Sequence, residues 1–184
     1  MNYPNNINKP YKKFVTYNNR GMDLENSINE ANEYYIENNL ALIYKKPTPI
    51  GIVKVSYENN SKVIDKAYFK EPSTLDYNGI FKGKYIEFEA KETTNKTSVP
   101  LRNIHPHQIK HIAKVLEHGG IVFIIIKINQ IDYLLDGKDF LDYILNNQRN
   151  SITYDYIKDK GFVIKYNFNK GLDYLNIVDQ VYFS

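Results

Sequence analysis

The segment that most constrains the fold of this chain is Ile121–Ile128, with the sequence IVFIIIKI. Apolar residues occupy both odd and even positions of this run, so a strand here has two apolar faces. Because both faces have to be covered, the strand is expected in the interior of a sheet that carries helices on either side. The run is too short to cross a bilayer, which takes roughly 18 or more apolar residues, and no other run reaches that length. The sequence therefore predicts a layered α/β protein.

Apolar periodicity and turn residues place further elements around this strand. Helices are expected at about Met22–Asn38, from Pro106 to Gly119–Gly120, and at Lys138–Leu145. Strands are expected at Leu40–Tyr44, Ile50–Tyr57, Lys62–Lys70, Tyr77–Phe81, Lys84–Ala90, Ile131–Leu135 and Phe162–Tyr166. The tail from Leu172 fits no single pattern. This order of elements predicts a mixed central sheet flanked by helices.

Two segments are expected to lie outside this core. Residues 1–16 are rich in proline, asparagine and lysine, which is typical of a flexible arm, whereas residues 17–184 are expected to form one domain. The strands Ile50–Tyr57 and Lys62–Lys70 are separated by a turn and predict a long hairpin. Its apolar pattern is thin and it carries several lysines, so we expect a stalk at about residues 52–71 that projects from the domain.

The composition of the chain narrows the chemistry available to it. The 184 residues include no cysteine, which excludes disulfides, thiol nucleophiles and sulfur-ligated zinc sites. Oxygen and nitrogen ligands remain, and these favour Mg²⁺ or Mn²⁺. The N-terminus lacks the apolar stretch of a secretory signal, so a cytoplasmic protein without membrane attachment is expected.

The residues best suited to chemistry are Asp76 and three charged residues on the strand that follows it. Within that strand, Glu87, Glu89 and Lys91 point to one face, and the apolar residues between them point to the other. Two carboxylates can hold Mg²⁺ ions that activate water and polarise a phosphodiester, and an ammonium beside them can offset transition-state charge. The same pattern also occurs by chance on solvated strand faces. Glu87 is expected to be a solvated or supporting acid.

Longer motifs make the assignment more specific. In chain order they are NRGMDLE (Asn19–Glu25), YKKPTPIGIVKV (Tyr44–Val55), AYFKEPSTLDYNG (Ala67–Gly79), YIEFEAKETTNKTS (Tyr85–Ser98) and HPHQIKH (His105–His111). Over about residues 17–128 these motifs resemble the RecU family of bacterial Holliday junction resolvases, and the Asp…Glu-x-Lys pattern resembles the signature of PD-(D/E)XK nucleases. The resemblance implies a restriction-endonuclease-like core with a protruding hairpin stalk that enters the junction centre. The proline of the motif, Pro72, is displaced, because it precedes Asp76 by four residues instead of directly.

The resemblance also implies roles for individual residues. It places Mg²⁺, with Mn²⁺ as a substitute, among the ligands Thr74, Asp76, Glu89 and Gln108. Lys91 is then the transition-state stabiliser beside the catalytic carboxylates. Glu25, on the first helix, is a further catalytic candidate that would hold a metal-bound water.

Basic residues near this set are candidate contacts for the DNA backbone. They are Arg20, Lys45, Lys46, Lys54, Lys62, Lys66 and Lys70, the last four on the predicted hairpin. Each of them alone is also typical of a solvated surface charge. The four histidines are expected at the surface or at phosphates. His107 and His111 are four residues apart on a helix, but no third ligand for zinc accompanies them.

These expectations combine into a Mg²⁺-dependent endonuclease that resolves Holliday junctions by symmetric nicking in recombination and DNA repair. Symmetric nicking of two opposed strands predicts a homodimer, whose twofold axis matches that of four-way branched DNA. The resemblance adds the strand-exchange recombinase and the branch-migration machinery as further partners. Two alternatives remain open: a PD-(D/E)XK nuclease that acts on other DNA, such as linear duplex, and a non-catalytic scaffold that binds junctions.

Overall fold

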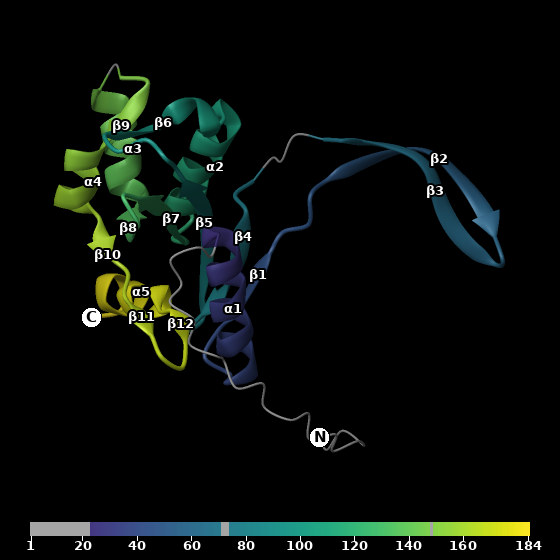
Figure 1. Ribbon diagram of the computed structural model, residues 1–184, viewed down its shortest axis with the longest axis horizontal. Helices are drawn as coiled ribbons and strands as arrows, with labels where there is room; N and C mark the ends of the chain where they lie inside the picture. The colour runs from purple at the N-terminus through teal and green to yellow at the C-terminus, as the bar shows by residue number, and fades with distance from the viewer. Residues whose placement is uncertain (1–22, 71–73, 148) are drawn as a thin grey trace.

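The computed structural model describes residues 23–70, 74–147 and 149–184, and a six-stranded sheet lies at its centre (Figure 1). The strands of this sheet are β1 (Leu42–Lys45), β4 (Tyr77–Phe81), β5 (Lys84–Glu92), β7 (Ile121–Ile128), β8 (Ile131–Asp136) and β10 (Phe162–Val163). They lie in the order β1-β4-β5-β7-β8-β10. β5 and β7 are parallel, and the other neighbouring pairs are antiparallel. The predicted mixed sheet is confirmed.

Helices cover both faces of the sheet, as Figure 1 shows. α1 (Leu24–Glu37) and α5 (Tyr174–Tyr182) pack on one face, and α2 (Pro106–Glu117), α3 (Gly137–Asn146) and α4 (Tyr154–Lys160) pack on the other. β7 contributes to both cores: Phe123 and Ile125 belong to the first, and Val122 and Ile124 belong to the second. All eight residues of β7 are buried, which confirms that this strand is interior.

A column of aromatic rings holds β4, β5 and β7 side by side. Tyr77 stacks on Phe88, and Phe88 stacks on Phe123, with 4.7 Å between ring centroids in each pair. Tyr174 of α5 lies against Phe88 at a centroid distance of 5.2 Å. Stacked and tilted rings at these distances add to the stabilisation from burial. The column therefore fixes the start of β4, where Asp76 is located, relative to β5.

The C-terminal third of the chain differs from the sequence-based expectation. A single strand at Phe162–Tyr166 is wrong, because β10 pairs with β8 whereas β11 (Tyr166–Asn167) pairs with β12 (Gly171–Leu172). Between them Ile164 is buried, and its N–H donates to the Asp132 carbonyl at 2.8 Å, so the chain turns at this point. The ambiguous tail contains α5. α4, β6 (Ser98–Pro100), η1 (Leu101–Asn103) and β9 (Ser151–Thr153) lie outside any predicted element, since such short segments carry little periodicity.

β2 (Ile50–Glu58) and β3 (Ser61–Phe69) pair with each other in a separate two-stranded sheet, which extends away from the rest of the chain in Figure 1. Their turn contains Asn59 and Asn60, whose positive φ angles of 48° and 62° are tolerated well by asparagine. Of the residues in these two strands, Gly51 alone is buried. The hairpin is therefore held by its own hydrogen-bond ladder and not by a core.

Some expectations stay predictions. The flexible arm at residues 1–16 and the DNA contact at Arg20 lie outside the described residues. The extent of a single domain over residues 17–184 also stays a prediction. Within the described ranges, no helix has the length and apolarity needed to cross a membrane.

Asp132 gives the fold a testable pH dependence. Its side chain is buried opposite Lys127 in the β7–β8 ladder, and burial raises its pKa from 3.8 to about 6, although the charge of Lys127 opposes the shift. The folded state therefore holds this proton more tightly than the unfolded state. As the pH rises from about 4 to about 6, ionisation of Asp132 should lower the free energy of unfolding by up to about 3 kcal/mol.

Asp132→Asn should flatten this decline, because the substituted side chain does not ionise. Urea denaturation between pH 4 and pH 7.5 measures the slope, and the exposed Asp142→Asn serves as the control. If the unfolding free energy of Asp132→Asn depended on pH as steeply as that of the wild type, the raised pKa of Asp132 would be contradicted.

Candidate active site

Two acidic side chains of β5 are buried against α2 and do not lie in solvent. Ile86 and Phe88 point into the core that contains α1 and α5, as the alternation along the strand predicts. Glu87 and Glu89 point the other way, and they are 0 % and 1 % exposed. A solvated Glu87 is therefore wrong, because side chains of α2 contact this part of the strand. Its contacts agree with a supporting acid.

Glu89 is the carboxylate at the centre of this cluster. Its Oε1 accepts a hydrogen bond from Lys91 Nζ at 2.5 Å. Its Oε2 accepts from the Asp76 backbone N–H at 3.1 Å and from Gln108 Nε2 at 3.2 Å. Burial raises the pKa of Glu89, and the negative charge of Asp76 adds to this shift, whereas Lys91 and the Asp76 N–H oppose it. The negative charges of Asp76 and Glu89 are therefore close enough to interact unfavourably.

The two glutamates of β5 hold the segment that carries Asp76. The N–H of Leu75 donates to Glu87 Oε1 at 3.2 Å, and the next N–H, that of Asp76, donates to Glu89. On the other side of the segment, the Asp76 carbonyl accepts from the Lys46 N–H at 2.8 Å. These three hydrogen bonds of the Leu75 and Asp76 backbone therefore fix the position from which the Asp76 side chain extends. Thr74, at the beginning of the segment, is half-buried.

Glu87 is buried but remains ionised, because it has several hydrogen-bond donors. Lys46 Nζ donates to its Oε1, the Tyr85 hydroxyl lies 2.9 Å from its Oε2, and His111 Nε2 lies 2.8 Å from the same oxygen. Burial alone would raise the pKa of Glu87, but the hydrogen bonds from Lys46, His111 and Tyr85 outweigh it and lower the pKa. His111 is therefore a partner of a buried acid, not a surface histidine.

The donor set suits a hard divalent cation. A cation between Asp76 and Glu89 would relieve their repulsion, and carboxylate oxygens are preferred ligands of Mg²⁺. Gln108 presents Nε2 to Glu89, while its Oε1 accepts from the His105 N–H at 2.9 Å, so its amide has to rotate before its oxygen can bind a metal. Within the described residues no three His, Cys, Asp or Glu side chains form a metal cluster. The ligand roles of Thr74, Asp76, Glu89 and Gln108 stay predictions.

Glu25, the remaining catalytic candidate, lies in the first turn of α1. It forms an ion pair with Lys45, and both side chains are exposed. Burial is the main cause that raises the pKa of Tyr77, and the charges of Glu25 and Asp76 add to the shift. Both carboxylates therefore lie near the Tyr77 hydroxyl. Glu25 therefore lies near Tyr77, as Asp76 does, and its ion pair is with Lys45 and not with a residue that contacts Glu89.

The lysines expected at DNA differ in their surroundings. Lys45 and Lys46 are paired with acids of the candidate site. On the hairpin, Lys54 pairs with Asp65 at 3.3 Å, and Lys62 lies 6.0 Å from the ring centroid of Tyr57. Lys66 and Lys70 are exposed. The contacts of all of these residues with DNA stay predictions.

Comparisons with known proteins identify the family of this chain. A family model described as "Recombination protein U" matches residues 19–180. This chain belongs to the RecU family. It is 50 % identical over 190 residues to proteins named "Holliday junction resolvase RecU" from Bacillus cereus (strain AH820), Bacillus anthracis and Bacillus thuringiensis (strain Al Hakam). Each alignment covers 98 % of this chain and 94 % of the relative.

The residues around Glu87 in this RecU chain were missed by the sequence-based search for a site. Tyr85 and Glu87 are two residues apart on one strand and so share a face, which is a signal that the sequence contains. Lys46 and His111 come from distant parts of the chain, and the Leu75 amide has no side-chain signature. Only the packing of α2 and the 74–76 segment onto β5 brings them together.

Glu87→Gln should destabilise this RecU chain by about 2–3 kcal/mol, because it leaves Lys46 without the buried charge that it pairs with. The lowered pKa means that the contribution of ionised Glu87 is present above about pH 4.5 and is lost as the pH falls through the lower folded-state pKa. Urea denaturation from pH 3 to pH 7.5 tests both effects, with the exposed Glu37→Gln as the control. Equal stability of Glu87→Gln and Glu37→Gln at pH 7 would contradict the role of the cluster.

Proposed function

We propose that this chain is a Holliday junction resolvase: a Mg²⁺-dependent endonuclease that nicks four-way branched DNA symmetrically during recombination and repair. The observation that carries the proposal is the convergence of Asp76 and Lys91 on the buried carboxylate of Glu89, in a chain of the RecU family. The names of the relatives support the same activity. A chain with only a scaffolding role has no need to bury the Glu89 carboxylate near the negative charge of Asp76, since such burial costs stability.

The residues of the site divide the work of phosphodiester hydrolysis. Asp76 and Glu89 would hold Mg²⁺, with Mn²⁺ as a substitute, and the metal would supply an activated water and polarise the phosphate. Lys91 is held by Glu89 Oε1 at 2.5 Å, so its ammonium is fixed beside the carboxylates and can offset charge on the phosphate. Glu87 holds the Leu75 amide and thereby keeps Asp76 in register with Glu89. Gln108 orients the Glu89 carboxylate through Nε2.

The hairpin and a second copy of the chain complete the proposed function. A junction has twofold symmetry, so nicks in two opposed strands require two sites related by a twofold axis, as in a homodimer. The β2–β3 hairpin extends from the fold with exposed lysines on both strands, which suits contact with the DNA backbone at the junction centre. In this proposal the hairpin selects branched DNA and the β5 site cuts it.

Asp76→Asn and Glu89→Gln should each abolish cleavage of a mobile four-way junction in Mg²⁺, because each removes a metal-binding charge. Junction binding should survive, since neither residue is part of the basic surface. Single-turnover nicking assays and gel-shift titrations on the same samples measure the two properties. The exposed Glu117→Gln, which removes one charge at the end of α2, should cut like the wild type. A wild-type cleavage rate in either site variant would disprove the assignment.

Shortening the hairpin should reduce the preference for junctions without changing the active site. Ile52 and Ala67 are cross-strand partners, so replacement of residues 53–66 by Asn-Gly closes the ladder with a two-residue turn. The expected result is a loss of at least about tenfold in junction affinity with linear duplex binding little changed. Anisotropy titrations with both substrates measure this preference.

Nicking assays on the same two substrates separate the proposed function from its alternatives. Equal cleavage of a junction and a linear duplex by the wild type would favour a nuclease for other DNA. Absence of any nicking in Mg²⁺ and in Mn²⁺ would favour a junction-binding scaffold.

A further inference from the structure

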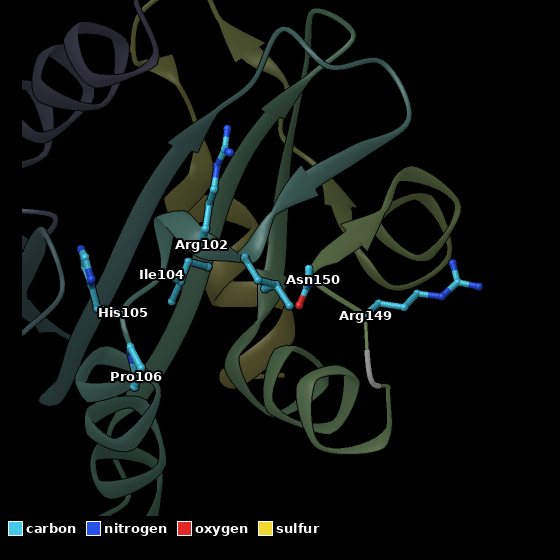
Figure 2. Close-up of a pocket in the computed structure, with 7 residues that line it drawn as sticks. Arg102, Ile104, His105, Pro106, Arg149 and Asn150 are labelled. Atoms are coloured by element: carbon cyan, nitrogen blue, oxygen red, sulfur yellow. The ribbon is translucent and has the colours of Figure 1, made fainter.

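A pocket of about 320 Å³ lies beside the first residues of α2, outside the set of residues so far assigned to the site. Figure 2 shows that two distant segments line it: residues that lead into α2, with Arg102 and His105, and the segment with Arg149 and Asn150. Both arginines are exposed at its rim, and in Figure 2 their guanidinium groups extend outward from the ribbon. The pocket is therefore bordered by two cations that are accessible to a large ligand.

A short β-ladder brings these two arginines together. β6 and β9 are antiparallel, and their last pair is Pro100 with Ser151. The Leu101 N–H then donates to the Asn150 carbonyl at 2.9 Å, which continues the pairing by one residue. Arg102, in η1, and Arg149 are the residues next to this hydrogen bond in the two segments, so their backbones lie near each other. The proximity of the two arginines is thus built into the backbone.

The charges of this pair are not compensated within the described part of the chain. Neither Arg102 nor Arg149 forms an ion pair there, whereas Lys45, Lys46 and Lys91 do. Exposed guanidinium groups without an acidic partner are available to bind an anion. Arginine is also scarce in this chain: of 24 basic residues only Arg20, Arg102 and Arg149 are arginine. Two of the three border one pocket, and arginine binds phosphate oxygens through a planar fork that lysine lacks.

The pocket is connected to Glu89 by two consecutive hydrogen bonds. His105, which lines the pocket, donates its backbone N–H to Gln108 Oε1 at 2.9 Å. Gln108 Nε2 in turn donates to Glu89 Oε2 at 3.2 Å. An extended polyanion whose reacting phosphate lies at Glu89 and Lys91 would therefore pass this pocket on leaving the site.

We propose that Arg102 and Arg149 form a subsite for the phosphodiester backbone of the DNA strand that adjoins the cleaved phosphate. This inference rests on the proposed function, since it takes branched DNA as the ligand. The two guanidinium groups extend in different directions, so they contact separate phosphates along the strand. They contribute affinity and register and take no part in the chemistry.

The double variant Arg102→Gln/Arg149→Gln tests the subsite. Its affinity for a four-way junction in Ca²⁺ should fall by about tenfold at low salt, and the slope of log K against log salt should shrink by about 1–2, one step per lost phosphate contact. The single-turnover cleavage rate at saturating enzyme should stay within about twofold of the wild type. Lys160→Gln/Lys165→Gln removes the same charge from exposed positions elsewhere and serves as the control.

The outcomes separate this inference from the proposed function. If the wild type nicks the junction but the double variant binds with the affinity and salt slope of the control, the subsite is wrong and the proposed function stands. If the wild type does not nick the junction, yet the double variant still loses affinity and slope, the subsite stands and the proposed function is wrong. If the double glutamine variant has a lower melting temperature than the wild type, the variant Arg102→Lys/Arg149→Lys replaces it in the test, because this variant retains both positive charges. It should bind between the wild type and the double variant, and binding as tight as the wild type would contradict a role for the guanidinium fork.

Discussion

The burial of two carboxylates side by side on one strand is the constraint on which the rest of this site depends. Glu87 and Glu89 are both removed from water, and an unpaired buried charge costs several kcal/mol. Each is therefore surrounded by donors, but the donors differ. Glu87 is satisfied by Lys46, Tyr85 and His111, and its pKa is lowered. The pKa of Glu89 is raised by its burial and by the nearby charge of Asp76, and Glu89 is the acid that we propose as a metal ligand.

The sheet makes this arrangement possible through the parallel pairing of β5 with β7. A parallel pair needs a crossover connection, and α2 is the helix of that connection. The crossover sets α2 against the polar face of β5, where Gln108 and His111 reach the two glutamates. The other face of β5 is fixed by the aromatic column through Phe88. The helix that completes the fold thus also completes the site.

The distribution of positive charge differs between the proposed catalytic site and the proposed DNA contacts. Lysines beside the site are paired with acids: Lys46 with Glu87, and Lys91 with Glu89. Cations available to a polyanion lie further out, on the β2–β3 hairpin and at the rim of the pocket beside α2. The net charge of +3 therefore understates the positive charge of these two outer sites, because acids pair with the lysines beside Glu87 and Glu89.

Local patterns in the sequence determined the interior strand β7, the alternation of β5, the start of α2 at Pro106 and the hairpin, and motifs from Asn19 to His111 predicted the family. These features are readable because periodicity and turn chemistry are properties of neighbouring residues. Only the tertiary structure decided that Glu87 is buried, that His111 and Lys46 are its partners, and that Arg102 and Arg149 border one pocket. Such contacts depend on how α2 and the β6–β9 ladder close over the sheet. Residues that are tens of positions apart are joined by that packing, and no local pattern records it.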